Sequence, residues 1–230
     1  MAVTPTFDAL FDRCVGIALD RQAHLLERIG EHDWELDLSA GRMTFHAPGG
    51  GNSVTTDVQV LGTESEGEWL WAWANEDAGL PAGVVRASRA LGQRADLDAP
   101  ELTRPRVAVQ DDEAHRIAMV ASASLDCAGY YRAPYEGGAA YLLIVGPELV
   151  EASPPPPVVR LATGWSRVLS AFAARVEDHR AALIAYGRRL GLDVVATPSG
   201  LVFEGPSGTV QATLDELGRV SAFQSRGQPR

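Results

Sequence analysis

Three tryptophans occupy alternate positions in the run GEWLWAWAN, residues 67–75. A spacing of two residues is the period of a β-strand, so this run predicts an extended segment with Trp69, Trp71 and Trp73 on one face. Such a face has two interpretations: it is the densest part of a hydrophobic core, or it is an aromatic wall that binds a sugar, a base or a cationic group. Tryptophan is strongly buried on average, which favours the core.

The segments before this run predict an antiparallel meander. Residues 34–40, 41–47 and 54–65 alternate between apolar and polar side chains and are separated by turn residues, which is the pattern of consecutive strands. Apolar residues at helical spacing predict a helix over 7–29 that ends at Gly30. A meander backed by helices is an α+β fold, and that is the fold class we expect.

Helices and strands continue to follow one another downstream. Helical spacing returns over 80–93 and over 111–125, where three acids suit the start of a helix. The segment 95–105 reads as a proline-bounded loop. The segment 127–146 predicts another pair of strands, the second of which is apolar throughout, as in a strand covered on both faces.

The four prolines Pro154–Pro157 favour a stiff extended spacer. We therefore predict a domain of helix and antiparallel sheet over 1–152, a proline linker over 153–157, and a helical segment with a small β-meander over 158–230. Within the last part, helical spacing extends to about residue 190. Asp178, inside this stretch, is a suitable cap for a second helix.

The two halves of the sequence share an order of elements. Residues 25–73 and residues 187–224 each run from the end of a helix through strands separated by short turns. Either the chain contains two duplicated helix-plus-meander sub-domains, or any unit of this type gives the same pattern, and the second interpretation is slightly favoured.

Composition narrows the classes of function. The net charge of −10 repels a nucleic-acid backbone and an anionic membrane surface, so we expect neither as a partner. A basic protein surface would be attracted and is the favoured kind of partner. No uncharged apolar stretch approaches the roughly eighteen residues of a membrane span. The N-terminus carries acids where a signal peptide needs basic charge, so we expect a cytoplasmic protein.

The tyrosine-rich run CAGYYRAPYEGG supplies the second group of candidate binding residues, Tyr130, Tyr131, Arg132 and Tyr135. On a strand, Tyr130 and Arg132 share one face, while Tyr131 and Tyr135 share the other. Arg132 among phenols is suited to holding a carboxylate or a phosphate. The alternative is a hairpin broken by proline and glycine, with tyrosines that cover a sheet edge.

The stretches LGTESEGEWLWAWAN and AGYYRAPYEGGAAYLLI resemble an uncharacterised family of bacterial proteins, mostly actinobacterial, that is defined only as a domain of unknown function. The resemblance extends over most of the chain and includes the segments VEDHRAALIAYGRRLGL and ATLDELGRVSAF. It implies no activity, cofactor or catalytic residue.

Other polar groups favour structural interpretations. The acids 111–113 and His115 have metal-ligand residue types, but consecutive residues point around a helix, which favours a solvated helix start. Glu64, Glu66 and Glu68 flank a tight turn, where side chains normally face water. We therefore expect no metal site, no cofactor and no recognisable catalytic residue.

Two classes of function remain. The favoured one is a non-catalytic cytoplasmic binding or protein-interaction protein, of an immunity or regulatory type, that neutralises a basic partner by charge complementarity. The alternative is an enzyme or binder that acts on a small molecule at a pocket lined by tyrosine, tryptophan and arginine.

Overall fold

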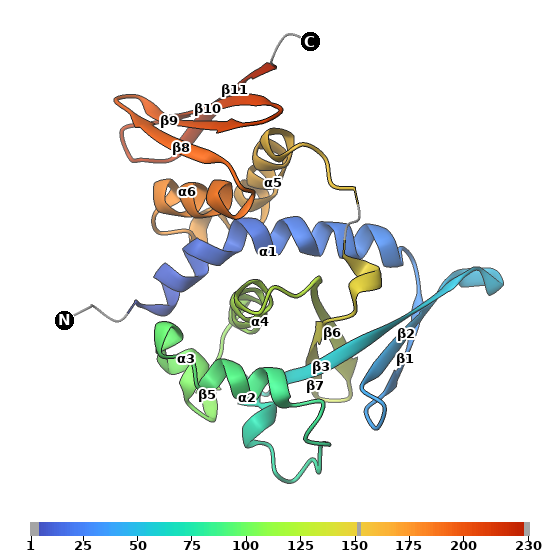
Figure 1. Ribbon diagram of the computed structural model, residues 1–230. Helices are drawn as coiled ribbons and strands as arrows, with labels where there is room; N and C mark the ends of the chain where they lie inside the picture. Colours follow the sequence, from blue (N-terminus) through green and yellow to red (C-terminus); the bar gives the residue numbers. More distant parts are fainter. Residues whose placement is uncertain (1–4, 151–152, 228–230) are drawn as a thin grey trace. The chain divides into compact units, whose positions relative to one another are not determined.

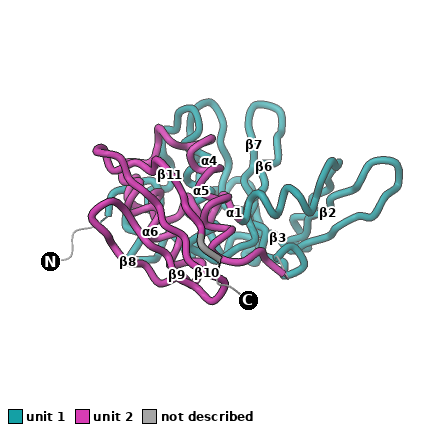
Figure 2. The backbone as a smooth tube through the Cα atoms, turned by 90° about the horizontal axis from the view of Figure 1, so that it is seen from above, with its two compact units in different colours: residues 1–7, 21–150 teal, residues 8–20, 151–230 magenta. Residues whose placement is uncertain are grey.

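The computed structural model describes residues 5–150 and 153–227 and has the predicted α+β fold (Figure 1). The chain forms two compact units (Figure 2). Unit 1 comprises residues 1–7 and 21–150, and unit 2 comprises residues 8–20 and 151–230. The first helix, α1 (Phe7–Ile29), therefore contributes residues to both units, and it has the bounds that helical spacing predicts.

Unit 1 contains an antiparallel sheet of seven strands in the described residues. The central strand is β3, which pairs with β2 through residues 53–57, with β7 through 58–65 and with β4 through 62–65. The meander predicted before the tryptophan run is therefore confirmed. The strands are β1 (Asp33–Asp37), β2 (Arg42–His46), β3 (Ser53–Ser65), β4 (Glu68–Trp71), β5 (Arg106–Ala108), β6 (Gly129–Tyr135) and β7 (Gly138–Ile144).

The helices of unit 1 after α1 are α2 (Arg86–Gly92), α3 (Pro100–Thr103) and α4 (Glu113–Ser124). Four 3₁₀ turns are also present, at Pro48–Gly50, Ala72–Ala74, Ala95–Leu97 and Pro147–Leu149. Helix α4 packs on β6 and β7 (Figure 1).

Two predictions between residues 80 and 105 are wrong in part. The helix predicted from residue 80 begins only at Arg86, because the Val84 carbonyl accepts a hydrogen bond from the amide of Val60 in β3 at 2.7 Å. A backbone group that pairs with a strand cannot also continue a helix. The predicted loop over 95–105 contains α3, which starts at Pro100 because proline needs no hydrogen-bond partner in the first turn.

The tryptophan run is extended only at its beginning. Strand β4 ends at Trp71, and residues 72–74 form a 3₁₀ turn, so the predicted single face of three indoles is wrong. Trp69 and Trp71 are both fully buried, with ring centroids 5.4 Å apart. Trp73 lies in the turn and is half-buried.

The core of unit 1 contains buried aliphatic and aromatic side chains from α1, β2, β3 and β7. Its largest described members include Leu25 from α1, Met43 and Phe45 from β2, and Leu142 from β7. Burial of such side chains is the main favourable contribution to folding.

In its described residues, unit 2 contains residues 8–20 of α1, two further helices, a 3₁₀ turn and a four-stranded antiparallel sheet. The strand order is β11-β10-β9-β8, so the predicted C-terminal meander is confirmed. The elements are α5 (Pro157–Phe172), the turn Ala173–Arg175, α6 (His179–Arg189), β8 (Asp193–Thr197), β9 (Gly200–Gly205), β10 (Gly208–Leu214) and β11 (Val220–Gly227).

The ends of the unit 2 helices follow local chemistry. Asp178 caps α6 as predicted, because its side chain accepts a hydrogen bond from the Ala181 amide at 2.8 Å. Proline 157, predicted to lie in an extended spacer, is instead the first residue of α5. Its fixed φ angle and missing N–H suit that position.

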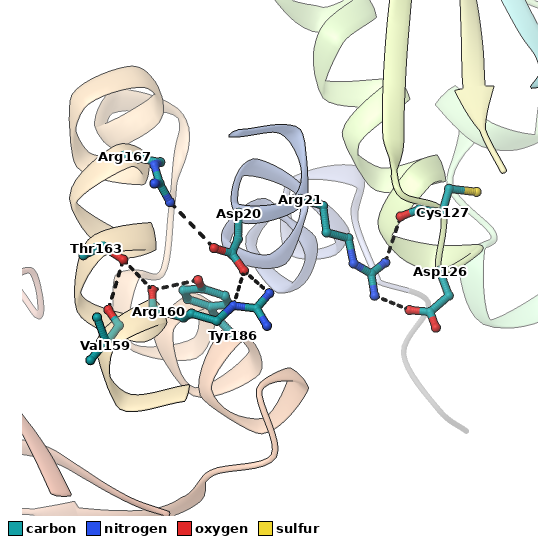
Figure 3. Close-up of polar contacts among 9 residues, drawn as sticks. All are labelled: Asp20, Arg21, Asp126, Cys127, Val159, Arg160, Thr163, Arg167 and Tyr186. Atoms are coloured by element: carbon teal, nitrogen blue, oxygen red, sulfur yellow. Dashed lines mark hydrogen bonds and ion pairs between the residues drawn. The ribbon is translucent and has the colours of Figure 1, made fainter. Parts of the chain in front are cut away.

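A buried ion pair joins α1 to α5 inside unit 2 (Figure 3). The Asp20 carboxylate, with 8% of its side chain exposed, accepts two hydrogen bonds from the Arg160 guanidinium, one of them from Nε at 2.9 Å. Arg167 lies 3.6 Å from the other oxygen. The Tyr186 hydroxyl donates to the Arg160 carbonyl at 2.9 Å.

Among the described residues, no helix combines the length and the apolar character that crossing a membrane requires.

Candidate functional site

A group of polar side chains in unit 1 lies where α4 packs on β6 and β7. Five side chains meet there: Glu64 from β3, His115 from α4, Tyr130 and Arg132 from β6, and Tyr141 from β7. We call these five residues the His115 cluster. They come from four elements, so only the folded chain brings them together.

Hydrogen bonds from α1 hold the backbone of Tyr130 in the His115 cluster. Gln22 of α1 binds its backbone from both sides, with a hydrogen bond to the Tyr130 carbonyl at 3.0 Å and one from the Tyr130 amide at 3.1 Å. The Tyr130 hydroxyl lies 2.9 Å from Nδ1 of His115. The Tyr130 ring stacks on Tyr141 with centroids 6.2 Å apart, and the His115 ring meets Tyr141 edge to face at 5.4 Å.

This hydrogen bond sets the tautomer of His115. Burial raises the pKa of Tyr130 well above its ordinary value, so the phenol keeps its proton at neutral pH. We therefore assign the phenol as the donor and Nδ1 of His115 as the acceptor of this hydrogen bond. The remaining proton of the neutral imidazole therefore lies on Nε2, which becomes a hydrogen-bond donor.

Arg132 and Glu64 form the exposed side of the His115 cluster. Arg132 Nη2 lies 3.9 Å from a Glu64 oxygen, with 41% and 26% of the two side chains exposed. Arg132 pairs with Tyr141 across β6 and β7, and its guanidinium works against the rise in the pKa of Tyr141 that burial causes. At 3.9 Å the ion pair is loose, so both charged groups keep hydrogen-bonding capacity.

Trp69 forms the apolar floor next to these groups. Its ring lies 5.2 Å from Tyr141 and covers Gly62, where an added Cβ would come within 2.7 Å of the indole. The buried Trp69 N–H has no hydrogen-bond partner in the described residues. A buried donor of this kind is normally satisfied by a water molecule or a ligand oxygen.

Several charges act on the imidazole of His115. Burial lowers its pKa below the ordinary value of 6.5, and the positive charge of Arg132 adds to this effect, whereas Asp112 and Glu64 oppose it. The imidazole is therefore neutral at pH 7, as its role as an Nε2 donor requires.

We expect acid to destabilise the protein through His115. Between the lowered folded-state pKa and 6.5 the unfolded chain binds more protons than the folded chain, so the free energy of unfolding decreases as the pH falls through this window. Denaturant unfolding at about pH 7.5 and about pH 5.5 measures the loss. His115→Gln should show a smaller loss than the wild type. Equal losses in the two proteins would contradict the assignment.

The other candidate residues lie elsewhere. Tyr131 is on the opposite face of β6, where its hydroxyl meets Nε2 of His32 at 3.0 Å and its ring lies beside Phe45. Tyr135 is exposed at the end of β6. Trp71 is buried and donates to the Glu101 carbonyl at 3.0 Å, and Trp73 packs against Gly92. Of the seven candidates, the structure thus places only Tyr130, Arg132 and Trp69 at one site.

Three residues of the site differ from the sequence interpretation. His115, expected at a solvated helix start, is half-buried against Tyr130, and Glu64, expected to face water, is partly buried beside Arg132. Tyr141 lies in an apolar run that predicts a covered strand, so the sequence does not indicate it as a binding residue. The strand period places Tyr130 and Arg132 on one face, and the register then sets Arg132 opposite Tyr141 and Glu64 opposite Trp69.

The fold and the site together define an α+β protein in which helix α4 covers a cluster of polar side chains on a curled antiparallel sheet. The chain belongs to a family of unknown function (DUF6882), whose sequence model matches residues 8–147. All five residues of the His115 cluster lie in the matched segment, and the C-terminal segments of the resemblance lie outside it. Comparisons with curated proteins and with solved structures give no match.

Proposed function

We propose that this chain is a non-catalytic binding protein and that the His115 cluster holds a small zwitterion of the amino-acid type. The observation that carries the proposal is the loose pair of Arg132 and Glu64, 3.9 Å apart and partly exposed, whose charges both act on His115. The ligand carboxylate binds Arg132 and the Nε2 donor of His115, and the ligand amine binds Glu64.

The balance of charge favours a zwitterion over a simple anion. Glu64 and Asp112 both act on the site and together outnumber the positive charge of Arg132, while His115 is neutral. An anion alone would face this excess of negative charge, and an amine alone would compete with Arg132 for Glu64. A ligand that carries both a carboxylate and an amine pairs the carboxylate with Arg132 and the amine with Glu64.

The test is a titration of the protein with a panel of free L-amino acids, followed by calorimetry, with acetate and methylamine as fragments that carry one charge each. We expect at least one amino acid to bind and neither fragment to match it. Arg132→Gln should weaken that binding by about tenfold or more, because a hydrogen bond to a charged group is lost.

Arg106→Gln is the matched control for this variant. Arg106 also pairs with a glutamate of the same sheet, Glu68 on β4, but it lies outside the His115 cluster. Binding should be unchanged in this variant. Unaltered affinity in Arg132→Gln, or acetate binding as tightly as the amino acid, would contradict the proposal.

The net charge of −10 supports a second candidate function, a cytoplasmic immunity-type or regulatory protein that binds a basic protein surface. Such an association weakens steeply with added salt, because exposed charges are screened. Binding of an amino acid at the His115 cluster would not depend on salt to the same degree, which separates the two functions.

A further inference from the structure

A second feature of unit 1 is a cavity of about 430 Å³ on the side of β3 toward the β1–β2 turn. It lies between Gly41 of that turn, Arg42 at the start of β2, Asp57 of β3, and the segment from Pro81 to Arg86, the first residue of α2. This volume is within the range of small-molecule sites, about 300–1,000 Å³. None of its lining residues belongs to the His115 cluster.

Hydrogen bonds to β3 hold both walls of the cavity in place. The Val58 amide donates to the Gly41 carbonyl at 2.8 Å on one side, and the Val60 amide donates to the Val84 carbonyl at 2.7 Å on the other. The Gln59 side chain donates to the Gly83 carbonyl at 2.9 Å and accepts from the Ala87 amide at 3.1 Å. The cavity is therefore preformed, which lowers the entropic cost of binding.

The charges around the cavity sum to +1 in a protein of net charge −10, from Arg42, Arg86 and Asp57. Arg42 has an acidic partner, because its Nε lies 3.4 Å from an Asp57 oxygen. The Arg86 guanidinium has no hydrogen bond or ion pair with another described residue. An unsatisfied guanidinium at the rim of a preformed cavity is suited to one carboxylate.

The rest of the cavity lining is partly apolar, and Ser39 and Gln59 are its polar members. Val84 is buried in the wall, and Pro81 and the half-exposed Val145 border the opening. A ligand that fits this lining has a short apolar body as well as its charged group. We propose that this cavity binds a small monocarboxylate with a short aliphatic chain, with the carboxylate on Arg86.

The test is an NMR titration of the ¹⁵N-labelled full chain with butyrate, with n-butanol and inorganic phosphate as comparison probes. We expect saturable shifts of the Gly41 and Gly83 amides with butyrate. Arg86→Gln should weaken this binding by about tenfold, since one charge-assisted interaction is lost. Arg89→Gln, on the exposed side of the same helix and outside the cavity, should bind butyrate like the wild type.

Three results would overturn the proposal. One is the absence of saturable shifts at Gly41 and Gly83 with butyrate, and another is equal affinity in Arg86→Gln and the wild type. The third is tighter binding of n-butanol or phosphate than of butyrate. Arg132→Gln leaves this cavity intact, so its butyrate affinity should stay unchanged even if the His115 cluster fails its own test.

Discussion

Replacing Trp71 with alanine should destabilise the protein by about 3–5 kcal/mol, the range for truncation of a large buried aromatic side chain. Trp71 is fully buried in contact with Trp69, and its indole N–H satisfies the carbonyl of Glu101. The variant loses the packing, leaves a cavity and removes the hydrogen bond to the Glu101 carbonyl. Chemical denaturation followed by circular dichroism measures the difference in the free energy of unfolding.

Trp73→Ala is the matched control, because it removes the same side chain two residues away from a half-buried position in the 3₁₀ turn. We expect a smaller loss, about 1–2 kcal/mol, because less apolar surface leaves the core. If Trp71→Ala were as stable as the wild type and had lost a ligand instead, the two indoles of β4 would form a binding wall and not a core.

The second large effect is expected at Asp20. Asp20→Asn removes the buried negative charge that Arg160 and Arg167 share, and leaves Arg160 with an uncompensated charge next to Tyr186 (Figure 3). We expect the free energy of unfolding to decrease by about 3 kcal/mol, because removing one partner of a buried ion pair costs far more than the pair contributes to stability. The double variant Asp20→Leu with Arg160→Met should regain most of this loss.

Asp126→Asn is the control, because Arg21 also carries an ion pair from α1, to Asp126 at 2.5 Å, but the aspartate side chain is 74% exposed. Solvent screens this pair, so the change should be below about 1 kcal/mol. Asparagine also tolerates the positive φ of 60° at this position. Equal losses in Asp20→Asn and Asp126→Asn would show that the ion pair of Asp20 is not effectively buried.

The sequence predicts most elements of the fold because their signals are local. The helical period of 7–29, the strand period of 54–65 and the cap at Asp178 each depend on a few neighbouring residues, and all three agree with the structure. The division into an N-terminal domain, a proline linker and a C-terminal sub-domain stays a prediction. The two interpretations of the shared helix-plus-meander order both stay hypotheses.

The errors occur where contacts distant in sequence determine the backbone. The tryptophan run has the strand period through Trp73, but the chain turns after Trp71, whose amide pairs with the Pro105 carbonyl. Likewise, residues 80–85 have helical spacing, but pairing of Val84 with β3 prevents a helix there. A periodic pattern records which side chains are buried and does not record which backbone groups pair with another strand.

The site was partly predictable for the same reason. The period of β6 places Tyr130 with Arg132, and separates both from Tyr131, without knowledge of the fold. The pairing of Tyr130 with His115 depends on α4 crossing the sheet, and that of Arg132 with Glu64 on β7 lying between β6 and β3. Only the register of those strands selects Glu64 from among three similar glutamates.

The most direct test of the proposed binding site is the protonation state of His115, observed in long-range ¹H–¹⁵N correlation spectra of the full chain at neutral pH. We predict a neutral imidazole with its proton on Nε2 and with Nδ1 accepting from Tyr130, so that addition of the bound amino acid shifts the Nε2 resonance. A proton on Nδ1, or a cationic ring at pH 7, would contradict the account, because His115 would then offer the ligand no Nε2 donor of the kind described.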